Sequence, residues 1–336
     1  MALTSGVRSV SGTVTVGGQQ VAIISGGANI EATRQSSTMH ALCALGEFPG
    51  RDSFFASLSD NSGKLSVNGQ TLVDGEWDTF AIDYDNAVVR LSGRDKSAAL
   101  HEKKSSEKFA NKTRAEVLKD VASRNGLTAK IAGATLKAGK IFQIDWAKLT
   151  DGISDGAILH KLAELEGARW WIKGNILNFV KQGDTTSSYL VQYRQGPPAS
   201  GNFLRLSFSS NLQAAKTIEV NVKSWHQKKK KIIESSKTRN GTGGTLTYNY
   251  RSPGLEQDHA DDLALRKLQD HSRHERSISV EMVGDTSIDP GMGLQLQGTA
   301  FDQTYEIDSI FHNIGPSGYT MTINAASGKE GSSGGS

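Results

Sequence analysis

The chain has 336 residues, of which 37% are hydrophobic and 22% charged, and its formal net charge is +3. Single hydrophobic cores stop growing near ~250 residues, so this length predicts two or three domains. No uncharged apolar run approaches the ~18 residues of a membrane-spanning helix, which excludes that class. The first residues lack the basic start and apolar core of a secretion signal, so export by the general pathway is not expected.

Composition favours a β-rich chain in a reducing compartment. The 36 glycines against 6 prolines indicate many turns and bulges between strands, since glycine accepts positive φ at little steric cost. Cys43 is the single cysteine, so no intrachain disulfide or multi-thiolate metal site can form. Residues 1–100 carry 7 basic and 10 acidic side chains, residues 101–185 carry 15 and 10, and residues 186–336 carry 16 and 15. The middle segment is therefore the basic one.

Residues 1–104 predict a first β domain. Valine alternates with threonine up to a turn at Gly17 and Gly18, and an apolar run resumes at Val21, which is the pattern of a hairpin. Further short strands are expected at residues 64–67, 70–73, 79–83 and 87–92, with a turn at Asp74 and Gly75 among those between them. Such closely spaced strands predict a small barrel or sandwich.

Residues 105–185 predict a mixed α/β insert. Thr113 and Glu116 fit a capping box, and Asn125-Gly126 would end that helix. A second helix is expected from Ser154 to residue 166, with Gly167 as its stop. Two strands around a Gly174-Asn175 turn then complete the insert.

Residues 186–327 predict a second β domain. Alternation is clear around residues 204–208 and 218–222, and strands are also expected at 278–282, 294–297, 305–310 and 319–324. Residues 235–245 are expected to form a long exposed loop, and residues 255–274 a helix, so that the domain carries a loop and a helix at about 232–276. Residues 328–336 form a polar Gly/Ser tail.

Two groups of side chains could carry chemistry. His271 and His274 lie three residues apart on the predicted helix, near His259, and could share a metal, but a solvated charged helix face explains them without one. Asp83 and Asp85 share a strand face, as a carboxylate pair for glycoside chemistry would, but exposed acids at a strand end explain them equally well. The common hydrolase, zinc-protease and phosphate-loop motifs are absent from the sequence, so we expect no catalytic site, metal site or cofactor.

The most conspicuous charge run is Lys228, Lys229, Lys230 and Lys231, which follows Trp225. Lysines beside an indole could hold phosphates and stack a base. Lysines on an edge strand also prevent edge-to-edge aggregation, and this is the interpretation we favour. Contact with nucleic acid or an acidic partner remains open.

The order of segments resembles the late-control-D family, the baseplate hub proteins of contractile-tailed phages. The landmarks are Gly93-Arg94-Asp95 after a strand, Asn111-Lys112-Thr113 before the first helix, Ser154-Asp155 before the second, Val222 to Trp225, Pro290-Gly291, Tyr305 with Ile307, and His312 with Gly318-Tyr319-Thr320. They span roughly residues 60 to 325. In place of an aromatic residue often found early in the second helix, this chain has Ala157-Ile158-Leu159.

The resemblance implies a structural, non-enzymatic protein with two tube-like β-barrels flanking an α/β segment. Three copies would form a ring that joins the sixfold tail tube to the threefold central spike and lets DNA pass. Its partners would be other copies of itself, the tube protein, the spike protein and other baseplate proteins, with DNA only in transit and no membrane insertion. It would be assembled in the host cytoplasm and belong to the virion. Residues 93–95 and 228–231 are candidate contacts with neighbouring proteins.

Two alternatives belong to other classes. A tail-associated cell-wall hydrolase would need paired carboxylates or a zinc site, for which Asp83 and Asp85 are the only candidates. A nucleic-acid-binding module would need basic and aromatic residues on one face, whereas the first domain is net acidic. If the first barrel lines a DNA channel, such a wall lets the polyanion slide without sticking.

Overall fold

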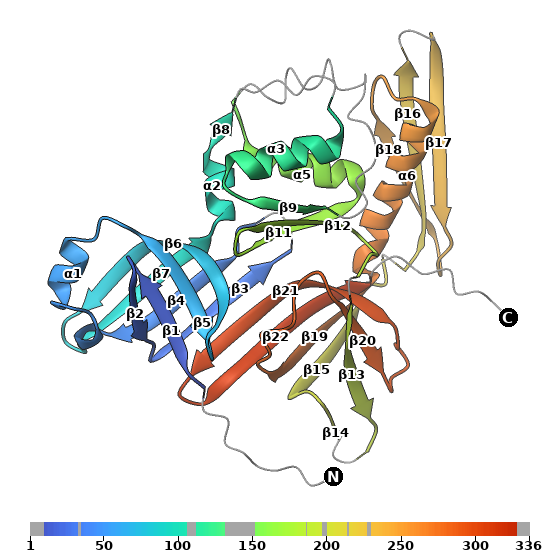
Figure 1. Cartoon of the computed structure of the whole chain (residues 1–336). Helices are drawn as coiled ribbons and strands as arrows, with labels where there is room; N and C mark the ends of the chain where they lie inside the picture. The colour runs from blue at the N-terminus through green and yellow to red at the C-terminus, as the bar shows by residue number, and fades with distance from the viewer. Residues whose placement is uncertain are drawn as a thin grey trace.

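The computed structural model describes residues 10–32, 35–105, 112–131, 152–185, 187–196, 200–213, 215–226 and 230–327. Two barrel-like β domains lie side by side, an α/β insert covers their junction, and a helix-backed sheet stands beyond the second barrel (Figure 1). The expected class, mainly β with an α+β insert between two barrel-like domains, is confirmed. None of the described helices is long and apolar enough to cross a membrane.

The first barrel is a curved sheet whose strand pairings return to their starting point. Its strands are β1 (Gly12–Val16), β2 (Gln19–Ala22), β3 (Ser25–Glu31), β4 (Thr38–Ala44), β5 (Ser62–Val67), β6 (Gln70–Asp83) and β7 (Val88–Asp95). They pair in the order β3-β4-β7-β6-β5-β1-β2. Between β2 and β3, the Ile23 amide bonds back to β1 while the Ile24 amide bonds to β4. β2 and β3 thus act as one bent strand that completes the ring.

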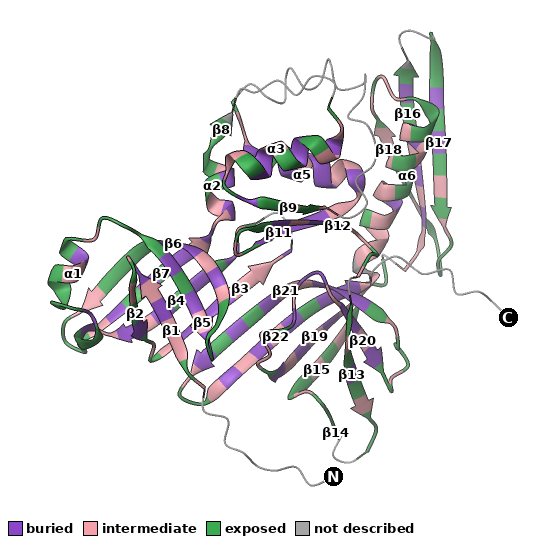
Figure 2. Ribbon diagram, in the orientation of Figure 1, coloured by how far each residue is buried: buried purple, intermediate pink, exposed green. Residues whose placement is uncertain are grey.

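Alternation along these strands builds the core of the first barrel. Apolar side chains at every second position point inward, as the buried positions along the strands in Figure 2 show. The inward set includes Val14, Val16, Met39, Ala41, Cys43, Leu65, Val67, Val89 and Leu91. Phe48, which follows the 3-10 helix η1 (Leu45–Glu47), forms a cluster with the two phenylalanines of helix α1 (Asp52–Ala56). Each buried Val or Leu contributes ~1.5–3 kcal/mol, so this core is the main source of the barrel's stability.

The second barrel has the same kind of closure. Its strands are β13 (Ser188–Arg194), β14 (Ser200–Gly201), β15 (Arg205–Ser210), β19 (Arg276–Val283), β20 (Gly293–Gln297), β21 (Thr304–Gly315) and β22 (Gly318–Ser327). β13 pairs with β14 and β20, β21 with β20 and β22, and β19 with β22 and β15. Between β14 and β15 the Leu204 amide bonds to Glu281 of β19. β14 and β15 therefore form a second bent segment.

The two barrels share one order of strand pairing. Taken along the chain, β1, β2/β3, β4, β5, β6 and β7 occupy the positions of β13, β14/β15, β19, β20, β21 and β22. One pairing differs in direction, because β1 is antiparallel to β5 whereas β13 is parallel to β20. The sequence shows no matching repeat, since alternation specifies inward and outward positions without specifying residue identity.

The insert packs helices against a small sheet. Its elements are α2 (Ser97–Glu102), β8 (Lys104–Ser105), α3 (Arg114–Arg124), β9 (Thr128–Ile131), β10 (Ile153–Ser154), α5 (Asp155–Glu166), β11 (Ala168–Lys173) and β12 (Ile176–Lys181). Both predicted helices are confirmed with their caps. Thr113 and Glu116 form the reciprocal capping box, the Ser154 hydroxyl accepts the Ala157 amide, and Gly167 ends α5 in the left-handed region at φ 57°.

Residues 217–275 form a helix-backed sheet next to the second barrel, and this sheet corrects the expectation of a long loop at residues 235–245. β16 (Thr217–His226), β17 (Lys231–Arg239) and β18 (Thr245–Arg251) form a three-stranded sheet covered by α6 (Gln257–Ser272), followed by η2 (Arg273–Glu275). The predicted loop at residues 235–245 is therefore wrong for residues 235–239, because β17 runs to Arg239, and only residues 240–244 form an exposed connection to β18. The polar residues of β17 resemble a loop, but β16 supplies their backbone partners and Ile233 is buried beside α6. The predicted helix over residues 255–274 is confirmed.

Candidate functional site at the barrel junction

The two barrels are joined edge to edge by β21 and β3. Antiparallel pairing runs from Ser309 opposite Glu31 to Ile314 opposite Gly26. β21 makes this contact with the part of its length that extends beyond β20. The approach is close: a Cβ on Gly27 would lie 2.4 Å from the His312 carbonyl oxygen. One sheet consequently runs through both barrels.

Matching rows of polar residues cross the face of this sheet that is turned away from the cores. In the second barrel the row is Ser309, Asn324, Ser279 and Ser207, on β21, β22, β19 and β15. The corresponding row in the first barrel is Thr79, Ser92 and His40, on β6, β7 and β4, and it ends at the buried Gly27 of β3. Burial lowers the pKa of His40, so its imidazole is neutral at pH 7. Neither row therefore carries a formal charge at that pH.

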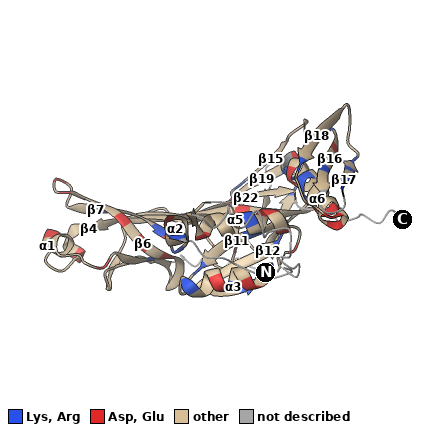
Figure 3. Ribbon diagram, turned by 90° about the horizontal axis from the view of Figure 1, so that it is seen from above, with Lys and Arg blue, Asp and Glu red and all other residues tan. Residues whose placement is uncertain are grey.

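The surrounding charge distribution sets these rows apart. Lys, Arg, Asp and Glu gather on α3, α5 and α6, while most of the strand ribbon carries other residues (Figure 3). Tight, sequence-independent DNA binding depends on Lys and Arg that neutralise phosphates. The two rows contain no such cation, and the nearest arginines on the same face are Arg90 and Arg94, on either side of Ser92, and Arg205, two residues from Ser207.

The predicted interface residues Gly93, Arg94 and Asp95 lie at the end of β7 and have partners within the chain. A Cβ on Gly93 would lie 2.2 Å from the Glu76 carbonyl oxygen, so glycine lets β6 and β7 approach. Arg94 forms ion pairs with Asp78 at 2.8 Å and with a carboxylate of α2 at 2.9 Å. Asp95 is buried, and burial raises its pKa. Their contact with a neighbouring protein stays a prediction.

The lysine run lies at the tip of the β16–β18 sheet. Lys228 and Lys229 fall outside the described residues. Lys230 occupies a turn with φ 47°, and Lys231 opens β17; both are exposed. Trp225 is also exposed, opposite another exposed apolar residue of β17. The tip thus presents basic and apolar groups together, and its use as an interface stays a prediction.

A buried charge cluster fixes the insert to the second barrel. Arg169 of β11 donates to the Ile307 carbonyl oxygen at 2.7 Å, and its Nε lies 3.8 Å from Glu306 Oε2. Arg273 of η2 lies 3.7 Å from the same carboxylate oxygen and pairs with Asp308. Burial lowers the pKa of Arg169, because it disfavours the charged guanidinium. Glu306 is thus the shared anion of the buried Arg169 and the partly buried Arg273.

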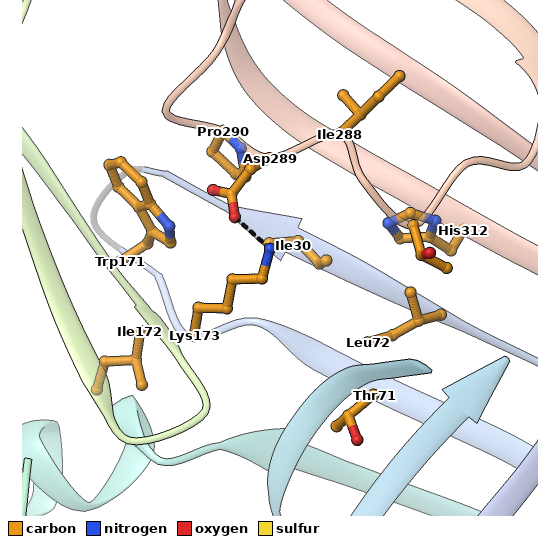
Figure 4. Close-up of a pocket in the computed structure, with 11 residues that line it drawn as sticks. Ile30, Thr71, Leu72, Trp171, Ile172, Lys173, Ile288, Asp289, Pro290 and His312 are labelled. Atoms are coloured by element: carbon orange, nitrogen blue, oxygen red, sulfur yellow. Dashed lines mark hydrogen bonds and ion pairs between the residues drawn. The ribbon is translucent and has the colours of Figure 1, made fainter. Parts of the chain in front are cut away.

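A small pocket lies where the insert meets both barrels (Figure 4). Ile30, Trp171 and Lys173 are among the residues that line it, and Lys173 Nζ lies 2.6 Å from the Asp289 carboxylate. The volume open to the centre of a water molecule is about 20 Å³. Ligand sites typically enclose ~300–1,000 Å³, so this pocket is a packing seam between domains.

His312 borders the same pocket and is fully buried. The Tyr319 hydroxyl lies 2.8 Å from its Nδ1. Burial lowers the pKa of His312 to about 4, and the positive charge of Lys173 acts in the same direction. The imidazole is therefore neutral at pH 7 and packs as a buried side chain beside the junction.

Two of the residues considered for metal or carboxylate chemistry, His271 and Asp83, have local partners. The His271 ring stacks on Tyr248 with 3.7 Å between centroids, and its Nε2 lies 2.6 Å from the Tyr250 hydroxyl. The side chain of His274 lies outside what the structure describes. Within the described ranges, no three His, Cys, Asp or Glu side chains are grouped to hold a metal. The Asn86 side chain hydrogen-bonds to Asp83 at 2.8 Å.

Sequence reasoning missed the two features that organise this region. The β21–β3 junction carries a signal in the small residues Gly26, Gly27 and Ala28, but small residues also occur in loops. Glu306 stands between the buried Tyr305 and Ile307, and an acid inside an apolar run is a signal for a buried ion pair. Neither signal predicts which strand or side chain the residues will contact.

Solved phage tail proteins share this architecture. The 43 kDa tail protein of prophage MuSo2 from Shewanella oneidensis aligns with a TM-score of 0.70 at 14% identity, over 94% of this chain and 96% of that one. The tail protein from Neisseria meningitidis MC58 aligns at 0.73 and 12% identity, over 95% and 97%. Prophage tail protein gp18 from Listeria monocytogenes EGD-e aligns at 0.63 and 11% identity, over 96% and 95%. The fold is therefore a phage tail protein fold.

A family assignment follows from the sequence profile. The profile described as YQBQ-like matches residues 79–326, which is most of the chain, and the chain belongs to this family. The match begins inside β6 and covers the insert, the second barrel and the helix-backed sheet. No curated protein matches the chain.

Proposed function

We propose that this chain is the structural hub of a baseplate in a phage or phage-like contractile tail, as its resemblance to late-control-D proteins implies. The observation that carries the proposal is the shared order of strand pairing in the two barrels. Each chain supplies two similar wall positions, so three chains supply six. Such a ring matches a sixfold tube on one side and keeps threefold symmetry for a spike on the other. The tail-protein fold supports the same role.

The hub contacts the tail tube protein, the central spike protein and other baseplate proteins, and DNA passes through it in transit. The rows themselves contain no lysine or arginine, which supports a channel wall of this kind, while Arg90 and Arg205 lie on the same face, two residues from Ser92 and Ser207. The role is non-enzymatic and needs no cofactor. The chain is assembled in the host cytoplasm and resides in the virion.

The test is the mass and shape of the assembled chain. Light scattering at assembly concentrations should report about three times 36.0 kDa. Images of purified tails should show about six lobes around a central hole, by the same closure argument. Tails that carry one or two copies, or a hub without a channel, would contradict the proposal.

Two activity assays separate the other classes. Clearance of peptidoglycan by the purified chain would indicate a cell-wall hydrolase. Tight DNA binding at physiological salt, weakening steeply as salt rises, would indicate a nucleic-acid-binding module. The hub proposal expects neither result.

A further inference from the structure

Residue positions in the two barrels correspond closely. β6 and β21 each show one irregularity against the strand that follows, after Trp77 in β6 and after Ile307 in β21. Aligning these two points places Thr79 at the position of Ser309. The buried residues of the neighbouring strands then coincide: Val89 with Met321, Leu91 with Ile323, Met39 with Ile278, Ala41 with Val280, and Cys43 with Met282. The correspondence thus extends from strand order to individual side chains.

The junction between the two barrels of one chain is made by two strands, and each of these strands has a counterpart in the other barrel. Inside the chain, β21 of the second barrel pairs with β3 of the first. The counterpart of β21 is β6, and the counterpart of β3 is β15. Among the described residues, 79–83 of β6 pair with β7 alone, and β15 pairs with β19 alone. An open strand edge presents unpaired backbone N–H and C=O groups that favour another strand.

We propose that residues 79–83 of β6 in one copy pair antiparallel with β15 of the next copy, repeating the β21–β3 junction between chains. This inference rests on the proposed ring and specifies the contact that closes it. The register follows from the internal junction, where Phe311 lies opposite Asn29. Their counterparts are Ala81 and Ser209, so Ala81 lies opposite Ser209 of the next copy.

The apolar side chains of the two edges are complementary. Phe80 is 46% exposed and Tyr84 is 68% exposed, although the counterpart positions of β21 are buried. The register places Ile82 opposite Phe208, and Phe208 and Leu206 of β15 are only half-buried. Pairing would remove this apolar surface from water on both copies.

The opposite face of the same contact is polar. The register places Asp83, the last residue of β6, opposite Ser207. A carboxylate can accept a hydrogen bond from a serine hydroxyl. Asp83 thus has a use that requires no catalysis. Ser207 also ends the polar row of the second barrel, so this row would meet a carboxylate of the next copy.

A second copy is needed because the two edges are far apart in one chain. The strands β19, β22, β21, β3, β4 and β7 lie between β15 and β6 in the sheet, and the two edges belong to different barrels (Figure 1). The contact is therefore head to tail. Contacts of this kind close into a ring when the rotation between copies divides a full turn.

A disulfide trap tests the register. A chain with both Ala81→Cys and Ser209→Cys is concentrated and oxidised, and the native Cys43 does not compete because it is buried. On a non-reducing gel we expect bands at two and three times 36.0 kDa, with nothing larger. The same trap is applied to assembled tail particles, which covers a ring that forms only on a tube or spike.

The matched control carries Ala81→Cys with Ser207→Cys. It keeps both thiols on the same face but shifts one by two residues, so that diagonal neighbours lie ~7–8 Å apart, beyond the usual span of a disulfide. Its cross-linked fraction should be several-fold lower. Chains with either single cysteine should not form the ladder.

The outcomes separate this inference from the proposed function. A trimer by light scattering whose in-register pair cross-links no better than the control overturns the β6–β15 pairing and leaves the hub intact. A chain that is monomeric both in concentrated solution and in purified tails overturns the hub and the pairing together. A ladder that ends at three copies supports both.

Discussion

Replacing Glu306 with glutamine tests the idea that one buried carboxylate holds the insert on the second barrel. Glu306 faces Arg169 and Arg273, and its Oε1 accepts the Gly183 amide. Glutamine keeps the size of the side chain but removes its charge. Arg169 would then remain buried without its anion, a situation that typically costs about 3–5 kcal/mol. At roughly 2–4 °C per kcal/mol, thermal unfolding should shift down by roughly 6–20 °C.

The matched control is Asp78→Asn, which also removes a carboxylate from an arginine. The Asp78–Arg94 pair is about one-third exposed on each side, and such pairs contribute about 0–1 kcal/mol. Calorimetry and urea titration of both variants should therefore give a large shift for Glu306→Gln and a small one for Asp78→Asn. Equal shifts would refute the argument. In a Glu306→Leu background, adding Arg169→Met should recover part of the loss, because it removes the stranded charge.

Three further predictions concern the junction and the absence of chemistry. Between pH 6.5 and pH 4 the imidazole of residue 312 is protonated in the unfolded chain but stays neutral in the folded one, so the free energy of unfolding should fall by about 3 kcal/mol over this range. The variant His312→Gln lacks this group, so its urea midpoint should depend less on pH there. Gly27→Ala should lower the melting temperature because its Cβ would meet the β21 backbone, whereas Gly46→Ala, with open space around it, should not; equal effects would contradict the close approach. A chelator should leave the melting temperature unchanged, and a loss of several degrees would reveal a structural metal.

The sequence by itself determined the helices of the insert, since their signals are local. Thr113 with Glu116, Ser154 and Gly167 act within a turn of the residues they cap, and each does so in the structure. Alternating strands such as β15, β19 and β22 were also predictable, because one buried face imposes a period of two.

Strand continuity needed the tertiary structure. Asp74-Gly75 has the composition of a turn, yet β6 runs straight through it: a Cβ on Gly75 would lie 2.0 Å from the Arg94 carbonyl oxygen, so the glycine serves close strand approach. β3 was not predicted because its small residues carry little strand propensity on their own. It becomes a strand because β4 and β21 pair with its two edges.

The equivalence of the barrels lies beyond local reasoning altogether. Ile82 and His312 occupy corresponding positions and share no chemistry, because a strand position specifies which way a side chain points and not what it is. Strand order depends on which edges meet across more than 200 residues, as Phe311 and Asn29 do. These long-range strand pairings depend on how the complete hydrophobic cores pack, and that packing exists only in the folded chain.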